Sequence, residues 1–100
     1  MRIPSDVQKE ILRHLSAARF YLPVVLRQPD DYDAESQYIE YLHHTEYELA
    51  LECLEDLGNI NSNFAEELYF WSELLFAAQL MELAEHIAMC KSKIASCDKP

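Results

Sequence analysis

The chain has 100 residues, half of them apolar, and a formal net charge of −10 at pH 7. This length suits one domain with one hydrophobic core, so we expect residues 1–100 to form a single domain. The sequence contains only one glycine and four prolines, and therefore lacks the residues on which the tight turns of an antiparallel sheet depend. The composition argues against a β-sheet protein and favours an all-α fold.

The sequence gives no indication of a membrane-spanning or secreted protein. The longest mainly apolar stretch, residues 68–83, is interrupted by four polar residues and is shorter than the roughly 20 residues of a membrane span. No basic segment leads into an apolar run near the N-terminus, so we expect no secretory signal and a cytoplasmic location. The three cysteines, Cys53, Cys90 and Cys97, are too few and too far apart for a disulfide framework.

Apolar residues at three- and four-residue spacing predict the first two helices. The first should run from Asp6 to about Leu22, with Ser5 or Asp6 as its N-cap. Residues 27–33 are predicted to form a loop, because they contain a proline and three aspartates. The second helix should follow over residues 34–43.

Capping signals predict the ends of the third helix. Thr45 should begin it as the N-cap, since Glu48 stands three residues later, as in a capping box. Gly58 and Asn59 should end it, because a helix commonly stops at glycine.

The remaining chain predicts a fourth helix opened by residues 61–63, and the helical pattern continues from Glu82 to about Ala95. The fourth helix is apolar round most of its circumference, so it is either the centre of the core or the carrier of an exposed apolar surface. The expected fold is a compact bundle of four to five helices. Its core should contain Leu15, Leu42, Leu51, Leu54, Leu68, Trp71 and Leu75.

Acidic and basic residues are segregated along the chain. Residues 28–90 contain fifteen acids and no lysine or arginine. On the third predicted helix, Glu48, Glu52, Glu55 and Asp56 share one face without a basic neighbour, although like charges at this spacing destabilise a helix. Counter-charge could come from the basic first helix or from a basic partner, and the face could also serve solubility alone.

The acidic run predicts a partner-binding surface on the second and third helices and the loop before them. Direct binding to nucleic acid is disfavoured, because phosphate recognition needs a basic surface. A row of carboxylates can instead occupy the cationic groove of a nuclease and accelerate association. The candidate partner-binding residues are Asp30, Asp31, Asp33, Glu40, Glu48, Glu52, Glu55 and Asp56. The four on the third helix are expected to be exposed.

The motifs of enzymes and metalloproteins are missing. The single glycine excludes a glycine-rich phosphate loop. His43, His44 and Glu46 form the one cluster that suggests a metal, but adjacent histidines diverge by about 100 degrees on a helix and cannot share a face as zinc ligands do. We therefore expect no catalytic residues, no cofactor and no bound metal.

Two segments resemble small helical immunity proteins of bacterial toxin systems: YIEYLHHTEYELALECLEDL (residues 38–57) and FWSELLFAAQLM (residues 70–81). Such proteins accompany contact-dependent growth inhibition toxins (CdiI) and MafI-like loci. The resemblance implies a cytoplasmic antidote that binds and blocks a cognate toxin domain, commonly a nuclease. Glu82 stands where such sequences commonly have a glycine, so the last helix is predicted to continue without a break.

Two other classes of function compete with an immunity protein. An acidic secretion chaperone or adaptor would hold a helical or unfolded segment in an apolar groove around Phe70, Leu74 and Phe76. An enzyme would need a pocket that contains a carboxylate or histidine with a shifted pKa.

Overall fold

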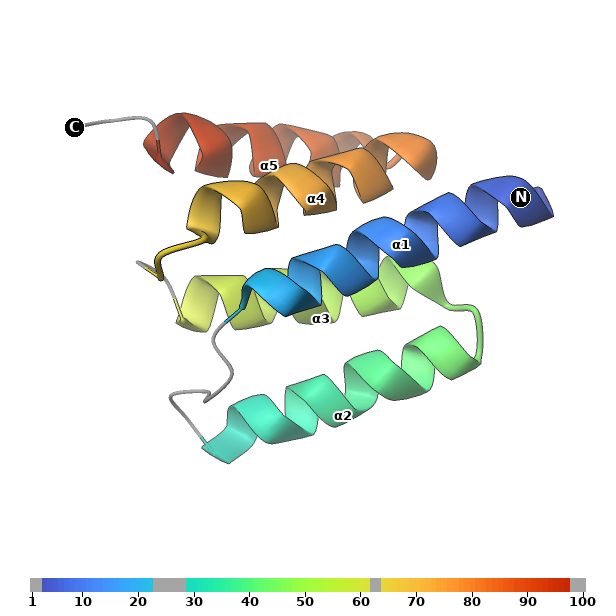
Figure 1. Ribbon diagram of the computed structural model, residues 1–100, viewed down its shortest axis with the longest axis horizontal. Coiled ribbons are helices and arrows are strands. Elements are labelled where there is room, and N and C mark those ends of the chain that lie inside the picture. Colours follow the sequence, from blue (N-terminus) through green and yellow to red (C-terminus); the bar gives the residue numbers. More distant parts are fainter. Residues whose placement is uncertain (1–2, 23–28, 62–63, 98–100) are drawn as a thin grey trace.

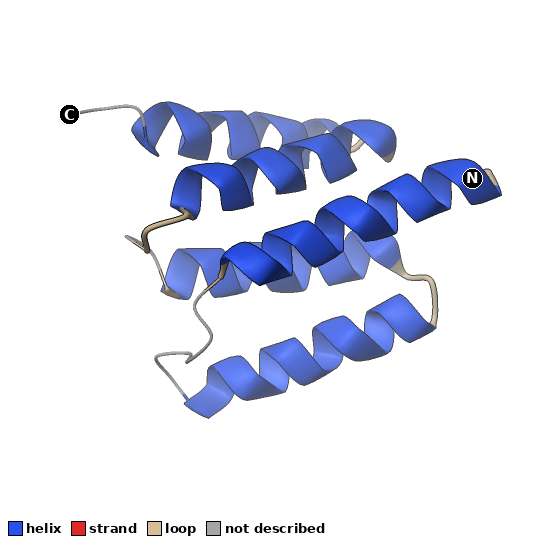
Figure 2. Ribbon diagram, viewed as in Figure 1, coloured by secondary structure: helices blue, strands red, loops and turns tan. Residues whose placement is uncertain are grey.

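The computed structural model describes residues 3–22, 29–61 and 64–97, with the backbone alone described at 29–32. Within these ranges the chain forms helices and no strand (Figures 1 and 2). The helices are α1 (Ser5–Tyr21), α2 (Pro29–His43), α3 (Tyr47–Ile60), α4 (Glu67–Leu80) and α5 (Ala84–Cys97). The prediction of an all-α bundle of four to five helices is confirmed.

The five helices differ in how many neighbours cover them. α4 packs extensively against both α1 and α5 and also touches α3, whereas α2 packs mainly on α3. Figure 1 shows α2 and α5 at opposite edges of the molecule, with the other three helices between them. Because α2 has one principal neighbour, much of its surface faces solvent.

One cluster of buried side chains joins all five helices. Among the predicted core residues, Leu15, Leu51, Leu54 and Trp71 are fully buried, while Leu42, Leu68 and Leu75 are half-buried. The indole nitrogen of Trp71 donates a hydrogen bond to Glu67 Oε2 at 3.2 Å, so the buried ring keeps a polar partner. None of the helices in the described ranges has both the length and the apolar character required to cross a bilayer.

Gly58 lies inside α3 and does not end it. The predicted stop is wrong, because α3 continues to Ile60. A Cβ atom at Gly58 would lie 2.3 Å from Cε2 of Phe70. Glycine is therefore required by the close approach of the Phe70 ring, although glycine lowers helix stability by roughly 0.5–1 kcal/mol relative to alanine.

The predicted N-terminal caps are also wrong. Pro4 occupies the N-cap position of α1, and no side chain caps that helix. α2 begins at Pro29, so the predicted loop over residues 27–33 is helical from residue 29 onward; residues 27–28 lie outside the described ranges. Proline is favoured at a first helical position because it lacks an N–H group and has a helical φ. α4 begins at Glu67, later than predicted.

Two helices end in the same left-handed turn. At the end of α2, the N–H of Thr45 donates to Leu42 and the N–H of Glu46 donates to Tyr41, at 3.1 and 2.8 Å. Thr45 has φ 56. This Schellman pattern satisfies the last carbonyl groups of a helix. Thr45 therefore ends α2, and the predicted capping box at the start of α3 is wrong.

The end of α4 repeats this geometry. The N–H of Glu82 donates to Gln79 and the N–H of Leu83 donates to Ala78, at 3.1 and 3.0 Å. Glu82 has φ 57. The prediction of an unbroken last helix is wrong, since Glu82 adopts a conformation that glycine usually provides and α5 begins anew at Ala84.

Candidate partner-binding surface

The acidic residues of α2 lie at the edge of the molecule. Asp33 and Glu40 are exposed. The Glu40 carboxylate lies 3.9 Å from His44 Nε2, and both side chains are about two-thirds exposed or more, so this pair contributes little to stability. Asp30 and Asp31 belong to the first turn of α2, but their side chains lie outside the described part of the chain.

The four carboxylates predicted to share a face of α3 lie in different environments. Glu48 and Asp56 are exposed and Glu52 is half-buried, whereas Glu55 is only 5% exposed. The expectation that all four are exposed is wrong for Glu55. α5 accounts for the difference, because His86 of that helix lies against Glu55.

His86 is the main polar link between α3 and α5. Its Nδ1 lies 2.9 and 2.8 Å from the two carboxylate oxygens of Glu55, and its Nε2 lies 3.6 Å from Glu52 Oε2. Burial opposes the charged imidazolium, but Glu55, Glu52 and Glu48 outweigh burial and raise the pKa of His86 above 6.5. Burial also raises the pKa of Glu55, against the opposing effect of His86.

Sequence reasoning missed His86, although a signal was present. His86 adjoins Leu83, Ile87 and Cys90, whose helical spacing marks the inward face of α5. A histidine next to that stripe should face another helix. Because residues 28–90 contain fifteen acids, a carboxylate was the expected neighbour of this histidine.

α1 supplies counter-charge to α2 and a polar contact to α4. The Arg19 guanidinium forms an ion pair with Glu35 of α2. His14 Nδ1 lies 2.6 Å from Glu73 Oε2 of α4. The basic first helix therefore does neutralise part of the acidic run, while Asp33, Glu48 and Asp56 form no ion pair with any residue that the structure describes.

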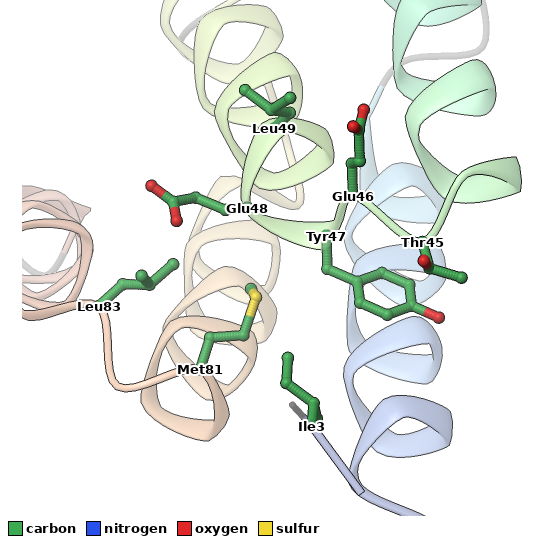
Figure 3. A pocket seen from close by; sticks show the side chains of 8 residues that line it. All are labelled: Ile3, Thr45, Glu46, Tyr47, Glu48, Leu49, Met81 and Leu83. Carbon is green, nitrogen blue, oxygen red and sulfur yellow. The ribbon is translucent and has the colours of Figure 1, made fainter. Parts of the chain in front are cut away.

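An open apolar groove of about 570 Å³ lies beside the start of α3. Figure 3 shows Ile3, Tyr47 and Met81 gathered there, with Glu46 and Glu48 extending in different directions next to Tyr47. The left-handed turn at Thr45 and the residues flanking Glu82 bound the groove. The remaining lining residues are Leu49 and Leu83.

We define the α2–α3 acidic surface as the exposed carboxylates of these elements: Asp33, Glu40, Glu46, Glu48 and Asp56. Glu46 was not among the predicted binding residues. The structure adds it because the residue follows the turn at Thr45 and lines the groove. His43 and His44 are also exposed, and the donor atoms of His43, His44 and Glu46 form no metal-binding group within the described ranges.

A second exposed surface is aromatic. Phe20 is 82% exposed, and Tyr69 and Phe76 are about half exposed. The rings of Tyr21 and Tyr69 lie 5.6 Å apart, which joins α1 to α4 along this surface. The prediction of a chaperone groove around Phe70, Leu74 and Phe76 is wrong for two of these residues, because Phe70 and Leu74 are fully buried in the core.

No protein-family model, curated protein or solved structure matches this chain.

Proposed function

We propose that this protein is an immunity protein that binds a basic bacterial toxin domain, in particular a nuclease, through the α2–α3 acidic surface. The observation that carries the proposal is the position of Asp33, Glu48 and Asp56, which are exposed and have no ion-pair partner in the described chain. Carboxylates left to solvent in this way attract a cationic partner over several ångströms and accelerate its association. A basic nuclease groove has the complementary charge.

The groove beside Tyr47 supplies the apolar component of such an interface. Protein interfaces combine a charged rim with a few large apolar or aromatic anchors. Tyr47, Met81 and Leu83 provide an apolar floor, and Glu46 and Glu48 provide two carboxylates at its edge. The proposed partner segment therefore carries an apolar side chain next to lysine or arginine.

Coexpression with a candidate toxin domain, taken from a gene next to the one that encodes this chain, tests the proposal. The variant Glu48→Lys with Asp56→Lys reverses two exposed charges on α3 and should lose protection of the host cell. The matched control is Glu66→Lys with Glu85→Lys, which makes the same change in net charge at two exposed positions, the N-cap of α4 and the first turn of α5. Full protection by the first pair, with helical content unchanged by circular dichroism, contradicts the proposal.

The exposed aromatic surface favours a second candidate, an adaptor that binds an apolar helix. Tyr69 and Phe76 lie seven residues apart on α4, a spacing that can accept the apolar stripe of another helix. In that case Tyr69→Ser with Phe76→Ser removes binding to the partner, while Glu48→Lys with Asp56→Lys preserves it. The two pairs of variants thus separate the candidates.

A further inference from the structure

Glu48, Glu52 and His86 bring three metal-binding side chains together from two helices. Glu48 and Glu52 lie one turn apart on α3, and His86 is in the first turn of α5. One ligand atom from each of the three residues lies within 4.8 Å of the other two. No other such group occurs in the part of the chain that the structure describes.

The orientation of His86 distinguishes this group from a cluster of surface acids. The Nδ1 atom lies within 2.9 Å of both oxygens of Glu55. An ionised carboxylate only accepts hydrogen bonds, so Nδ1 carries a hydrogen and donates it. Because Glu55 is buried, this bond fixes the plane of the imidazole and directs Nε2 toward Glu52.

Nε2 and the two carboxylates of α3 favour a positive charge between them, which either a proton on Nε2 or a bound cation can supply. Without a proton on Nε2, its lone pair faces the Glu52 carboxylate oxygen at 3.6 Å, which is a contact between two acceptors. A metal ion satisfies all three groups at once. In metalloproteins, a ligating histidine almost always donates its other ring N–H to a carboxylate or carbonyl group, which orients the ring and raises its basicity.

We propose that Glu48, Glu52 and His86 bind one divalent transition-metal ion, and that Zn²⁺ is the ion that fits best. One imidazole nitrogen with two carboxylate oxygens is a donor set that zinc accepts, and three protein ligands leave a fourth position for water or a partner's side chain. Glu48 is exposed and Glu52 is half-buried, so both carboxylates can rotate toward the ion. The site does not rest on the proposed function.

The ion would connect two helices that have separate principal neighbours. α5 packs mainly on α4, and α3 packs mainly on α2. A metal held by both would attach the start of α5 to α3 and stabilise the folded chain in proportion to its occupancy. It would also neutralise two carboxylates of α3 and so reduce the negative charge next to the groove.

The test uses the 100-residue chain without an affinity tag, treated with chelator and then titrated with ZnCl₂ or CoCl₂. We expect one zinc per chain by calorimetry, visible absorption bands from bound Co²⁺, and a rise in Tm of several degrees at about one hundredfold excess over Kd. Long-range ¹H–¹⁵N spectra of the imidazole should show the metal on Nε2 of His86 and the hydrogen on Nδ1.

The variants are chosen so that folding is preserved. Glu48→Gln with Glu52→Gln removes two ligands without touching Glu55 or His86, and should weaken zinc binding at least tenfold. Asp56→Asn is the matched control, an exposed acid on the same helix, and should bind zinc as the wild type does. Equal affinity in the double variant, or no binding at about 1 mM zinc, overturns the proposal. Binding that disappears instead in Cys97→Ser assigns the ion to a cysteine site and overturns it equally.

Discussion

The α2–α3 acidic surface and the contact between α3 and α5 contain the same kind of side chain in opposite environments. Glu48 and Asp56 are exposed, whereas Glu55, on the same helix, is buried against His86. The difference arises because His86, at the start of α5, lies against Glu55 and leaves Glu48 and Asp56 exposed. Acidic residues in a sequence therefore form an acidic surface only where no neighbouring helix covers them.

Removal of the buried pair should have the largest effect on stability. His86→Ala leaves the Glu55 carboxylate without its counter-ion and should lower the free energy of unfolding by about 3 kcal/mol. Glu48→Ala removes an exposed carboxylate and should change it by no more than about 0.5 kcal/mol. Urea denaturation of both variants measures the two values. Equal changes in the free energy of unfolding would contradict the assignment of a buried environment to Glu55 and an exposed one to Glu48.

The same pair should make stability depend on pH. The pKa of His86 is raised in the folded protein, so its stabilisation is complete below pH 6.5 and is lost as the pH rises through the raised pKa. The raised pKa of Glu55 acts in the same direction. Folding favours the neutral form of this carboxyl group, so its contribution to stability is also lost as the pH rises.

We therefore expect the Tm of the chelator-treated protein to fall as the pH rises above 6.5, and to fall less steeply in His86→Gln. The groups that face His86 are Glu48, Glu52 and Glu55, and the variant retains all three. An identical slope in wild type and variant would show that His86 does not cause the dependence.

The two left-handed turns offer a smaller, stabilising change. Thr45 and Glu82 both have φ near 57, a conformation that costs a residue with a Cβ atom roughly 1–2 kcal/mol. After allowing for the greater freedom of glycine in the unfolded chain, Thr45→Gly and Glu82→Gly should each raise the free energy of unfolding by about 0.5–1 kcal/mol. Loss of stability in thermal unfolding would show that the turns depend on the side chains of Thr45 and Glu82.

The sequence predicted the helices and most of the core, because apolar periodicity reports which face of a helix is buried. It failed at Thr45 and Glu82, since neither residue type favours a left-handed turn, and at Gly58, where the reason for glycine is the distant Phe70 ring. The burial of Glu55 depends on where α5 lies, which no local pattern encodes. Glu48 and Asp56 are exposed as expected, and their role in binding stays a prediction. The groove beside Glu48 joins segments that are far apart in sequence.

The association rate of the toxin domain, measured over a range of salt concentrations, tests the central claim most directly. If the α2–α3 acidic surface steers a basic partner, Glu48→Lys with Asp56→Lys should slow association about tenfold or more at low salt and flatten its salt dependence. Glu66→Lys with Glu85→Lys should have a much smaller effect, and both variants should melt close to the wild type. An association rate and salt dependence equal to those of the wild type in the first variant would contradict the account.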